Sequence, residues 1–513
     1  MLKLPIGIQS FSEIINDKKV YIDKTEIIHK LLDGTYYFLS RPRRFGKSLL
    51  LSTLKAIFEG KHHLFEGLWI YDKIEWVSYP IIHISFTGIS ANIVGLEKGI
   101  ENALDEIAKK NDIILQTLDY ASKFSELLTK LNEKTGKKVV VLIDEYDTPI
   151  INHLPDNMPE AIANRNILKN FYDVVKNADD HIQFFFITGI SKFTKISIFS
   201  TLNNLNDISF DGKYAALCGL TPAEITDTFS SRISEIAKEM ELSEADFVQK
   251  MRLQYNGFCF TPKVDVTLYN PFSMLLFLSK GRFENFWFQT GTPTFLAKML
   301  REDFKYDLES IELPESVLQS YDLERLDYRA ILFQTGYISV KKEVENGVFL
   351  MGYPNEEVRA SMLHFILTEY LETRSGDSEL KLYELKKLLE AGDISGVMQS
   401  IDQMFSTIPA DLFKQHYENF YHAIIFMTFH LLGLKMKAEV QHRFGAIDGV
   451  VETGKYVYIF EFKVNKSAQS ALKQIKTNEY HLPYLDKGKK VFLVGVKFSA
   501  EKRGVDVWKH EIC

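Results

Sequence analysis

The stretch Tyr36–Gly60, YYFLSRPRRFGKSLLLSTLKAIFEG, constrains the fold of this chain more than any other. It has the order of a phosphate-binding loop: a short apolar strand, a loop and a helix. The usual signature is G-x-x-x-x-G-K-[ST], and counting back from Gly46, Lys47 and Ser48 places Arg41 where the first glycine stands. The stretch predicts a nucleotide site only if the loop can fold without that glycine.

Apolar runs alternate with helical patterns through residues 1–220, which predicts a doubly wound α/β fold around a parallel sheet. The expected strands are Tyr36–Ser40, Tyr79–Phe86, Lys138–Ile143, His181–Thr188 and Tyr214–Leu220. The expected helices include Lys47–Glu59, Ile93–Lys110 and Ala161–Lys176. We therefore expect a P-loop domain over residues 1–220.

A helix-start signature follows this domain. Thr221 is followed by Pro222 at the first helical position and by Glu224 three residues on, a pattern typical of a capped helix N-terminus. The region that it opens has mostly helical patterns. We expect a helical lid over residues 221–354.

The remaining sequence predicts a connector and a second α/β domain. A charged helical connector is expected over residues 355–410, and a small α/β domain over residues 411–513 that begins with an apolar helix from Tyr417. The further elements expected in this domain are strands at Ala446–Val451, Lys455–Val464 and Lys490–Val496, and a helix at Ala468–His481.

Composition excludes several classes of protein. The chain has 513 residues, of which 46% are hydrophobic and 25% charged, as in ordinary globular proteins, and its length suggests about three domains. The most apolar stretch, Ala423–Met436, is too short to span a bilayer as a helix, so no membrane partner is expected. No secretory signal is visible, and the three cysteines lack C-x-x-C spacing. We expect a cytoplasmic protein.

The net charge of −7 conceals a basic C-terminal region. Residues 431–513 contain 15 Lys and Arg but 9 Asp and Glu, a net charge of +6. A basic domain suits a polyanionic partner such as nucleic acid. Lysine-rich surfaces also serve solubility alone, so charge by itself leaves both interpretations open.

The phosphate-loop side chains suit a nucleotide and its metal ion. Gly46 can adopt the positive φ that lets backbone N–H groups approach phosphates at a helix N-terminus. Lys47 is expected against the β- and γ-phosphates, and Ser48 is expected to ligate Mg²⁺. Without further support, this short motif would be weak.

A second feature supports the nucleotide site. The apolar run Val139–Ile143 is followed directly by Asp144 and Glu145, and the carboxyl ends of parallel strands face the ligand crevice. Asp144 is expected in the Mg²⁺ shell, and Glu145 is expected to orient or activate water. The alternative is a solvated strand end followed by the turn at residues 147–149.

A third strand end carries Thr188 and then Ser191, Lys192 and Lys195 toward the same rim. A hydroxyl or a lysine there could sense the γ-phosphate. An ordinary polar loop fits the same residues equally well.

Acidic and basic residues also interrupt an apolar strand near the C-terminus. Asp448 precedes a short turn, and the next strand carries Glu461 and Lys463 on one face. Two carboxylates with one lysine suit a metal site that activates water for phosphodiester cleavage, and the following helix adds Gln474. A salt-bridged hairpin is the alternative, since D…E-x-K patterns are common by chance.

Several motifs resemble, in order, the bacterial AAA-ATPase-like family that is usually fused to a C-terminal PD-(D/E)XK nuclease-type domain. They are YIDKT at Tyr21–Thr25, RPRRFGKS, VVVLIDEYDTPI, ITGISKFTKISIFSTLNNLNDIS, YNGF and WFQTGTP. The resemblance implies an AAA-like or STAND-like P-loop domain that uses ATP and Mg²⁺. It also implies that RPRRFGKS, with Arg41 and Arg44, is the family's normal phosphate loop. The segment Tyr21–Thr25 matches a motif of unknown role, which we expect near the base or ribose of the nucleotide.

The nuclease part of the resemblance rests on Asp448, Glu461 and Lys463, and more weakly on Gln474 and either Glu418 or Glu439. It implies a site for Mg²⁺ or Mn²⁺. Relatives commonly read G-R-x-D before the first aspartate, whereas this chain reads Gly-Ala-Ile-Asp with Arg443 displaced. The departure affects expected contacts to the substrate backbone rather than the metal ligands.

These features favour ATP-regulated, metal-dependent cleavage of nucleic acid, with DNA as the expected partner of the basic domain. A competing hypothesis is a non-catalytic ATP-dependent switch or scaffold whose C-terminal domain only binds nucleic acid or protein. A homo-oligomer is compatible with both hypotheses.

Overall fold

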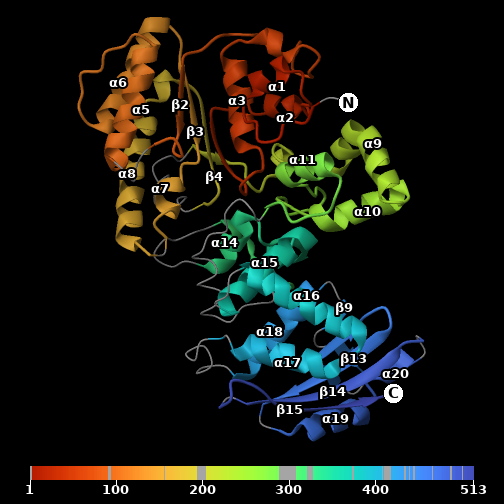
Figure 1. Cartoon of the computed structure of the whole chain (residues 1–513). Helices are drawn as coiled ribbons and strands as arrows, with labels where there is room; N and C mark the ends of the chain where they lie inside the picture. Colours follow the sequence, from red (N-terminus) through yellow and green to blue (C-terminus); the bar gives the residue numbers. More distant parts are fainter. Residues whose placement is uncertain are drawn as a thin grey trace. The chain divides into compact units, whose positions relative to one another are not determined.

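The computed structural model describes residues 3–513 except 90–93, 155, 193–203, 288–307, 320–326, 372–374, 407, 409–416, 433–434, 438–439, 443–444, 465, 486–487 and 500. The chain forms two compact units. The described residues of the first lie within Met1–Phe295 and Leu308–Arg359, and those of the second within Ala360–Cys513. Figure 1 shows the order of the helices and strands.

The first unit is built on a five-stranded sheet in the order β2-β3-β4-β1-β5, with every neighbouring pair parallel. Its strands are β1 (Tyr36–Ser40), β2 (Ile81–Ser85), β3 (Val139–Asp144), β4 (Ile182–Gly189) and β5 (Asn206–Asp207). The parallel α/β fold predicted from the apolar runs is confirmed.

Helices cover both faces of this sheet (Figure 1). One side holds α1 (Phe11–Asn16), α2 (Thr25–His29) and α3 (Lys47–Phe58). The other holds α5 (Leu96–Lys110), α6 (Tyr120–Thr135) and α8 (Met158–Asn177), with the short α7 (Thr148–Ile151) after β3. Single 3₁₀ turns lie at η1 (His62–Phe65) and η2 (Asp179–His181).

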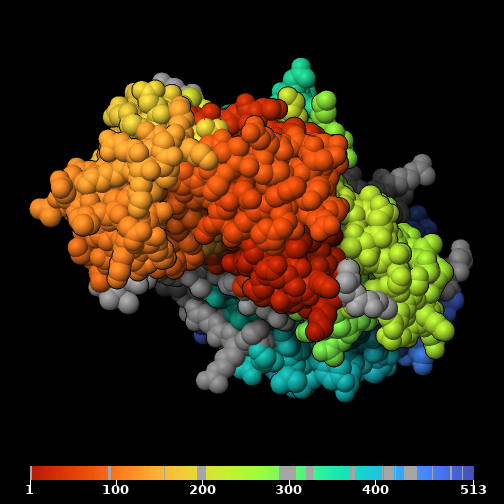
Figure 2. All heavy atoms as spheres, turned by 90° about the horizontal axis from the view of Figure 1, so that it is seen from above, coloured from red at the N-terminus to blue at the C-terminus, as the bar shows by residue number. Residues whose placement is uncertain are grey.

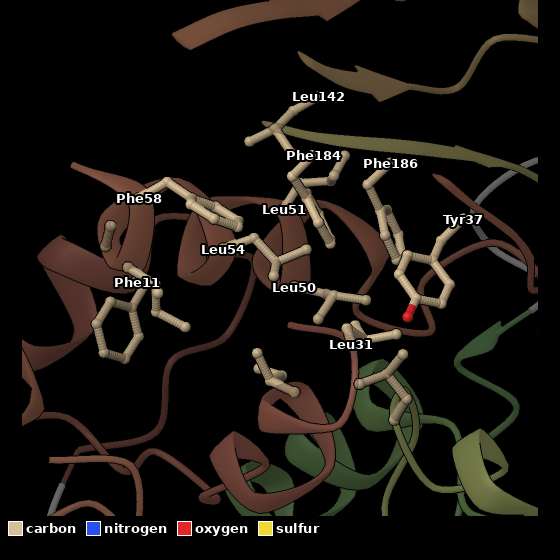
Figure 3. Close-up of a cluster of buried hydrophobic side chains, with 14 of the residues drawn as sticks. Phe11, Leu31, Tyr37, Leu50, Leu51, Leu54, Phe58, Leu142, Phe184 and Phe186 are labelled. Atoms are coloured by element: carbon tan, nitrogen blue, oxygen red, sulfur yellow. The ribbon is translucent and has the colours of Figure 1, made fainter. Parts of the chain in front are cut away.

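The core between α3 and the sheet explains why the phosphate loop is firmly placed. Leu50, Leu51 and Leu54 of α3 pack against a row of side chains that includes Leu142 and Phe184 (Figure 3). All of these side chains are at most 4% exposed. Each contributes about 1.5–3 kcal/mol of hydrophobic free energy relative to exposure. The helix that begins at the loop is therefore fixed to the central strands.

The predicted strand Tyr214–Leu220 is wrong. The 3₁₀ turn η3 (Gly212–Tyr214) and further turns occupy this stretch, and the fifth strand is the earlier, polar β5. The side chain of Asp211 accepts a hydrogen bond from the Lys213 amide at 2.9 Å, and Gly219 has φ 90°. These features are incompatible with an extended strand here. The side chains of Leu217 and Cys218 are still buried, but they come from turns and bends of the chain.

The lid region begins as predicted and then departs from the prediction. A capping box between Thr221 and Glu224 starts α9 (Pro222–Glu239), and α10 (Glu244–Tyr255) and α11 (Pro271–Lys280) follow. The mostly helical prediction missed an antiparallel sheet in the order β6-β8-β7. Its strands are β6 (Ile311–Pro314), β7 (Ser339–Glu345) and β8 (Val348–Gly352). The helices between β6 and β7 are α13 (Glu315–Gln319) and α14 (Tyr328–Thr335).

The N-terminal segment and the lid lie against each other in the first unit. Figure 2 shows the red N-terminal surface beside the yellow-green surface of the lid helices. The Lys24 ammonium group lies 2.6 Å from the carboxylate of Glu224, the capping residue of α9. This ion pair is largely buried, so it ties the two segments together.

The second unit has a sheet in the order β15-β14-β13-β12-β9, in which β13 and β14 are parallel and the other pairs antiparallel. Its helices are α15 (Glu356–Leu371, which begins in the first unit), α16 (Ser375–Ala391), α17 (Ile394–Ser406), α18 (Tyr417–Leu431), α19 (Ala468–Thr477) and α20 (Leu482–Leu485). Its strands are β9 (Lys435–Lys437), β10 (Val440–His442), β11 (Gly445–Ile447), β12 (Gly449–Glu452), β13 (Tyr456–Lys463), β14 (Lys490–Ser499) and β15 (Gly504–Ile512). The predicted small α/β domain is confirmed, although the prediction missed β9, β10 and β15.

Helix α19 approaches the sheet closely at Gly495. A Cβ added to Gly495 would lie 2.4 Å from the Ala468 carbonyl oxygen and 2.9 Å from the Leu472 amide nitrogen. Gly495 pairs with Glu461 on the neighbouring strand. The glycine therefore sets how closely the helix lies over the strand that carries Glu461.

We expect Gly495→Ala to destabilise the second unit by about 1–3 kcal/mol, because the helix must move off the sheet. Gly454→Ala is the matched control, since its added Cβ meets nothing within 4 Å. Hydrogen exchange of the β14 amides in the full chain measures the difference. Equal protection in the two variants would contradict this account of the packing.

Candidate nucleotide and metal sites

The phosphate loop reaches its conformation without a glycine at position 41. The loop residues with positive φ are Arg44, at 63°, and Gly46, at 94°. Arg41 is not among the residues with positive φ, so a side chain there carries no left-handed strain. The departure from the usual signature therefore falls at a position where this loop does not need glycine.

The Arg41 side chain is buried beneath the loop rather than lining a cavity. Its guanidinium group donates to the carbonyl oxygens of Ser40 at 2.9 Å and Ser209 at 2.7 Å, and it lies 4.4 Å above the ring of Phe260. Burial lowers the pKa of Arg41 to about 10. Arg41 thus supports the loop from below, in place of the direct cofactor contact expected from its position.

A cavity of about 730 Å³ brings together most of the predicted nucleotide-site residues. Gly46, Lys47 and Ser48 line it together with Asp144 and Glu145. Arg44, residues 5–9, the end of β2 and the α11 residues Pro271, Phe272 and Leu275 complete most of the wall. Strand ends, phosphate loop and lid therefore converge on one pocket of the first unit.

Lys47 is held within the loop. Its ammonium group donates to the carbonyl oxygens of Arg41 at 2.9 Å and Pro42 at 3.0 Å. Burial lowers the pKa of Lys47, while the nearby carboxylates of Glu145 and Asp144 oppose this shift. The side chain is only 5% exposed, so these carbonyls and carboxylates replace its hydration.

The two carboxylates at the end of β3 have different environments. Asp144 is buried and accepts a hydrogen bond from the Thr188 hydroxyl at 2.7 Å. Glu145 has φ 52°, which turns the chain directly after the strand. Burial raises the pKa of Glu145, and the charge of Lys47 opposes this rise. A raised pKa suits a group that accepts a proton near neutral pH.

The residues of the third strand end are engaged with protein groups. Thr188 is fully buried and positions Asp144, and Ser191 donates to the Asp147 carboxylate at 2.7 Å. Lys192 is 3% exposed and forms an ion pair with Asp207 at 3.0 Å. None of these three lines the 730 Å³ cavity. The predicted Lys195 lies outside the described residues.

The YIDKT segment lies beside this cavity without lining it. The Asp23 carboxylate accepts from the amides of Thr25 at 2.8 Å and Trp69 at 2.7 Å, and Lys24 pairs with Glu224. Tyr21 and Lys24 line an apolar cavity of about 110 Å³ that adjoins the 730 Å³ cavity and shares part of its wall, including Gly46 and Leu275.

Sequence reasoning missed Arg43. This residue also lines the 730 Å³ cavity, and its charge weakly opposes the rise that burial causes in the pKa of Glu145. RPRRFGKS contains three arginines. Alignment with the usual signature places only Arg41 at the position of the missing first glycine. The repeat of arginine was the available signal, but the sequence could not say that Arg43 and Arg44 line the cavity while Arg41 is buried beneath the loop.

In the second unit, the structure brings Asp448 beside Glu461. The β12–β13 register pairs Gly449 with Phe460, so Asp448 and Glu461 are the next positions along the hairpin. The Asp448 carboxylate accepts from the Phe462 amide at 2.8 Å. This hydrogen bond from a backbone amide orients the Asp448 carboxylate through one of its oxygens. The other oxygen could then bind a further ligand.

The Glu461 carboxylate has one buried oxygen without a hydrogen-bond partner. It is 0% exposed, and its Oε1 accepts from the Lys463 ammonium group at 2.7 Å, whereas its Oε2 is buried without a hydrogen-bond partner. Burial and the charge of Asp448 raise the pKa of Glu461 to about 7. An unpartnered carboxylate oxygen beside a second carboxylate fits a divalent cation.

The weaker predicted residues are not gathered at this pair. Gln474 is half-buried on α19, and no described contact joins its side chain to Asp448, Glu461 or Lys463. Glu439 and Arg443 lie outside the described residues, as does the Glu418 side chain. Among the described residues there is no group of three or more His, Cys, Asp or Glu side chains that could hold a metal ion.

The two sites define a P-loop ATPase fold joined to a nuclease-like fold, and comparison with known proteins agrees. Residues 5–199 match the family described as "Predicted AAA-ATPase", and residues 416–508 match the PD-(D/E)XK nuclease superfamily. The chain belongs to the family that joins these two domains.

A relative shares the whole arrangement. The chain is 36% identical over 522 aligned positions to an uncharacterised protein encoded in the 5′ region of vnfD in Azotobacter chroococcum mcd 1. The match covers 98% of each chain. In the part of the chain that the structure describes, no helix is long and apolar enough to cross a membrane.

The raised pKa of Glu461 predicts a pH dependence of stability. Between the ordinary value of 4.5 and about 7, the unfolded chain releases this proton while the folded chain keeps it. The free energy of unfolding should therefore fall as pH rises through this window, by about 3 kcal/mol at most. Glu461→Gln should remove this contribution, because its amide does not titrate.

Unfolding of the second unit in a chelator at pH 5 and pH 8 measures the effect. Glu501→Gln, at an exposed carboxylate, is the control and should keep the wild-type pH dependence. The same pH dependence in wild type and Glu461→Gln would refute the assignment.

Proposed function

We propose that this chain binds ATP with Mg²⁺ in the 730 Å³ cavity and couples nucleotide binding or hydrolysis to metal-dependent cleavage of nucleic acid, with DNA as substrate. The observation that carries the proposal is the meeting of Gly46-Lys47-Ser48 with Asp144 and Glu145 in one cavity. The unpartnered Glu461 oxygen supports the nuclease half.

In the nucleotide site, the backbone at Gly46 and the start of α3 would bind the phosphates, since a helix N-terminus favours anions. Lys47 would exchange its contacts to the loop carbonyls for phosphate oxygens. Ser48 and Asp144 would hold Mg²⁺, with Asp144 kept in place by Thr188. Glu145 would accept the proton of the attacking water, consistent with its raised pKa.

Glu145→Gln should bind ATP with near wild-type affinity but hydrolyse it about 10²- to 10⁴-fold more slowly, because the amide keeps the shape and loses the basicity. Lys47→Ala should instead lose ATP binding, since the loop loses its cation for the β- and γ-phosphates. Calorimetry and phosphate release separate the two effects. Undiminished hydrolysis by Glu145→Gln would exclude it as the base.

In the nuclease-like site, Asp448 and Glu461 would hold a divalent cation, Mg²⁺ or Mn²⁺. When bound, such an ion lowers the pKa of water and offsets charge on the phosphodiester. Lys463 already lies 2.7 Å from Glu461 and would stabilise the developing phosphate charge or position the water. We assign Gln474 to the same site only as an accessory residue.

Asp448→Ala and Glu461→Ala should eliminate cleavage while folding stability holds or rises, because each relieves repulsion between the carboxylates. Lys463→Ala should keep metal binding but raise the reaction barrier by about 2–4 kcal/mol. Lys466→Ala, at an exposed lysine nearby, is the matched control. Cleavage of plasmid and single-stranded DNA, with Mg²⁺ or Mn²⁺ and with or without ATP, measures the rates.

The Lys463–Glu461 ion pair also favours a second candidate, a non-catalytic ATP-dependent switch with a structural salt bridge in its nuclease-like domain. In that case Lys463→Ala should destabilise the domain, since it leaves a buried carboxylate unpaired. Added Mg²⁺ should then leave the melting temperature unchanged. Thermal melts with and without Mg²⁺ decide between the two candidates.

Partners and location complete the proposal. The net charge of +6 over residues 431–513 supports nucleic acid as the partner of this domain. We place the protein in the cytoplasm because Cys218, Cys259 and Cys513 are free thiols. A homo-oligomer remains compatible with the proposal, and sedimentation with and without ATP tests it.

A further inference from the structure

Strand β15 lies at one edge of the sheet in the second unit, and among the described strands it pairs only with β14. An edge strand presents backbone N–H and C=O groups with which a further strand can pair. Two apolar side chains of β15 are also largely exposed, Val507 at 46% and Ile512 at 50%. The edge of β15 is therefore a candidate surface for binding another strand.

The two halves of this edge differ. In the first half, the Asp402 side chain of α17 accepts from the Val505 amide at 2.8 Å and covers the edge there. In the second half, residues 507–512 keep a regular register with β14. The edge strand β7 is less suited to pairing, because its register is shifted twice and it carries consecutive charges at Lys341 and Lys342.

The hydrogen bonds to β14 establish which backbone groups of the second half point outward. Cys513 exchanges both backbone hydrogen bonds with Val491, at N···O distances of 2.9 and 3.4 Å. In an antiparallel pair, residues that make such bonds alternate with residues that do not. The backbone groups of Trp508, His510 and Ile512 therefore point away from β14, toward the edge.

A second copy of β15 complements this edge in one antiparallel register. When the pair is centred on His510, the outward backbone groups of Trp508 in one copy meet those of Ile512 in the other. The same register places Lys509 of each copy directly opposite Glu511 of the other. Centring the pair on Lys509 or on Glu511 would instead place like charges opposite each other, which is destabilising.

The two charged side chains are accessible for this pairing. Lys509 is exposed and donates to the Gln469 Oε1 at 2.9 Å, and Glu511 forms an ion pair with Lys476 that is nearly half exposed. Such surface contacts are weak and can be shared with a further charge. A register centred on Trp508 would place neither charge opposite its counterpart.

We propose that a second copy of this chain binds at this edge, with the two β15 strands antiparallel about His510, so that the two five-stranded sheets become one. The occupant is a second copy because the outward backbone groups and the charges of this edge are complementary to themselves. The pairing depends neither on ATP hydrolysis nor on cleavage of nucleic acid.

This pairing would fix the spacing of the two candidate metal sites. Glu461 lies level with Gly495, and Gly495 lies level with Lys509, one residue from the two-fold axis at His510. An axis that relates antiparallel strands of one sheet is normal to that sheet, so both Glu461 side chains would lie on the same face. Five strand spacings, about 24 Å, would separate the two β13 strands.

We expect sedimentation velocity of the full chain to show a dimer that dissociates on dilution. Lys509→Glu and Glu511→Lys should each raise the dimer dissociation constant about tenfold or more, because each places two pairs of like charges opposite each other. An equimolar mixture of the two variants should dimerise again, since the mixed pair restores opposite charges. Glu501→Lys, at an exposed residue just before β15, is the matched control and should dimerise as wild type does.

A cysteine substitution tests the register. A pair centred on His510 places Val507 of one copy opposite Cys513 of the other. Val507→Cys should therefore give a disulfide-linked dimer on mild oxidation with diamide, and Val507→Cys combined with Cys513→Ser should not. Within one chain the two positions are six residues apart on an extended strand, about 20 Å, which is too far for a disulfide.

A wild-type chain that stays monomeric would overturn the inference, as would a strand of another protein found at this edge. A dimer that both charge reversals leave unchanged, and that Val507→Cys does not link, would use another surface and would also overturn it. In these cases the ATPase and nuclease proposals still stand, since phosphate release and DNA cleavage test them separately. A dimer that passes both tests but lacks both activities would refute the proposed function and leave the pairing intact.

Discussion

The buried guanidinium group of Arg41 is the interaction on which the nucleotide site depends. A charge removed from water is costly unless its donors find partners. Here the carbonyl oxygens of Ser40, Ser209 and Tyr214 and the ring of Phe260 replace water at the terminal nitrogens, while Nε is buried without a hydrogen-bond partner. This anchoring fixes the backbone whose carbonyls at Arg41 and Pro42 hold the Lys47 ammonium group. Arg41, which departs from the usual signature, thus stabilises the conformation of the loop.

The same loop is joined to the lid. Asn270 caps α11 and also donates to the Arg43 carbonyl oxygen of the loop. The N-terminal segment is joined to the lid as well, through the pair of Lys24 with Glu224, the capping residue of α9. Both contacts use side chains that already stabilise a helix start. A change in loop conformation therefore acts directly on the lid helices of the first unit, which gives nucleotide state a physical route to the lid.

The two candidate sites use a common electrostatic arrangement. Each places two neighbouring carboxylates near the end of a strand with a lysine nearby, Lys47 at the start of α3 and Lys463 at the end of β13. Burial raises the pKa of one carboxylate in each site, Glu145 in the first unit and Glu461 in the second. They differ in what is left unpaired. Asp144 is oriented by Thr188, whereas Glu461 keeps a buried oxygen without a partner. The proposed cation would therefore supply the partner that this oxygen of Glu461 lacks in the second site.

The sequence by itself determined the parallel sheet, the phosphate-loop helix, the carboxylates after β3 and the pairing of Asp448 with Glu461, because periodicity and strand-end position are local properties. Only tertiary structure decided that the fifth strand is β5 rather than Tyr214–Leu220 and that Thr188 contacts Asp144. It also decided that Arg43 and Arg44 line the cavity while Arg41 is buried beneath the loop. The reason is that the deciding partners lie far along the chain: Arg41 contacts a carbonyl 168 residues away, and Arg43 contacts a side chain 227 residues away. No local pattern encodes such contacts, since they form only when separate segments pack together.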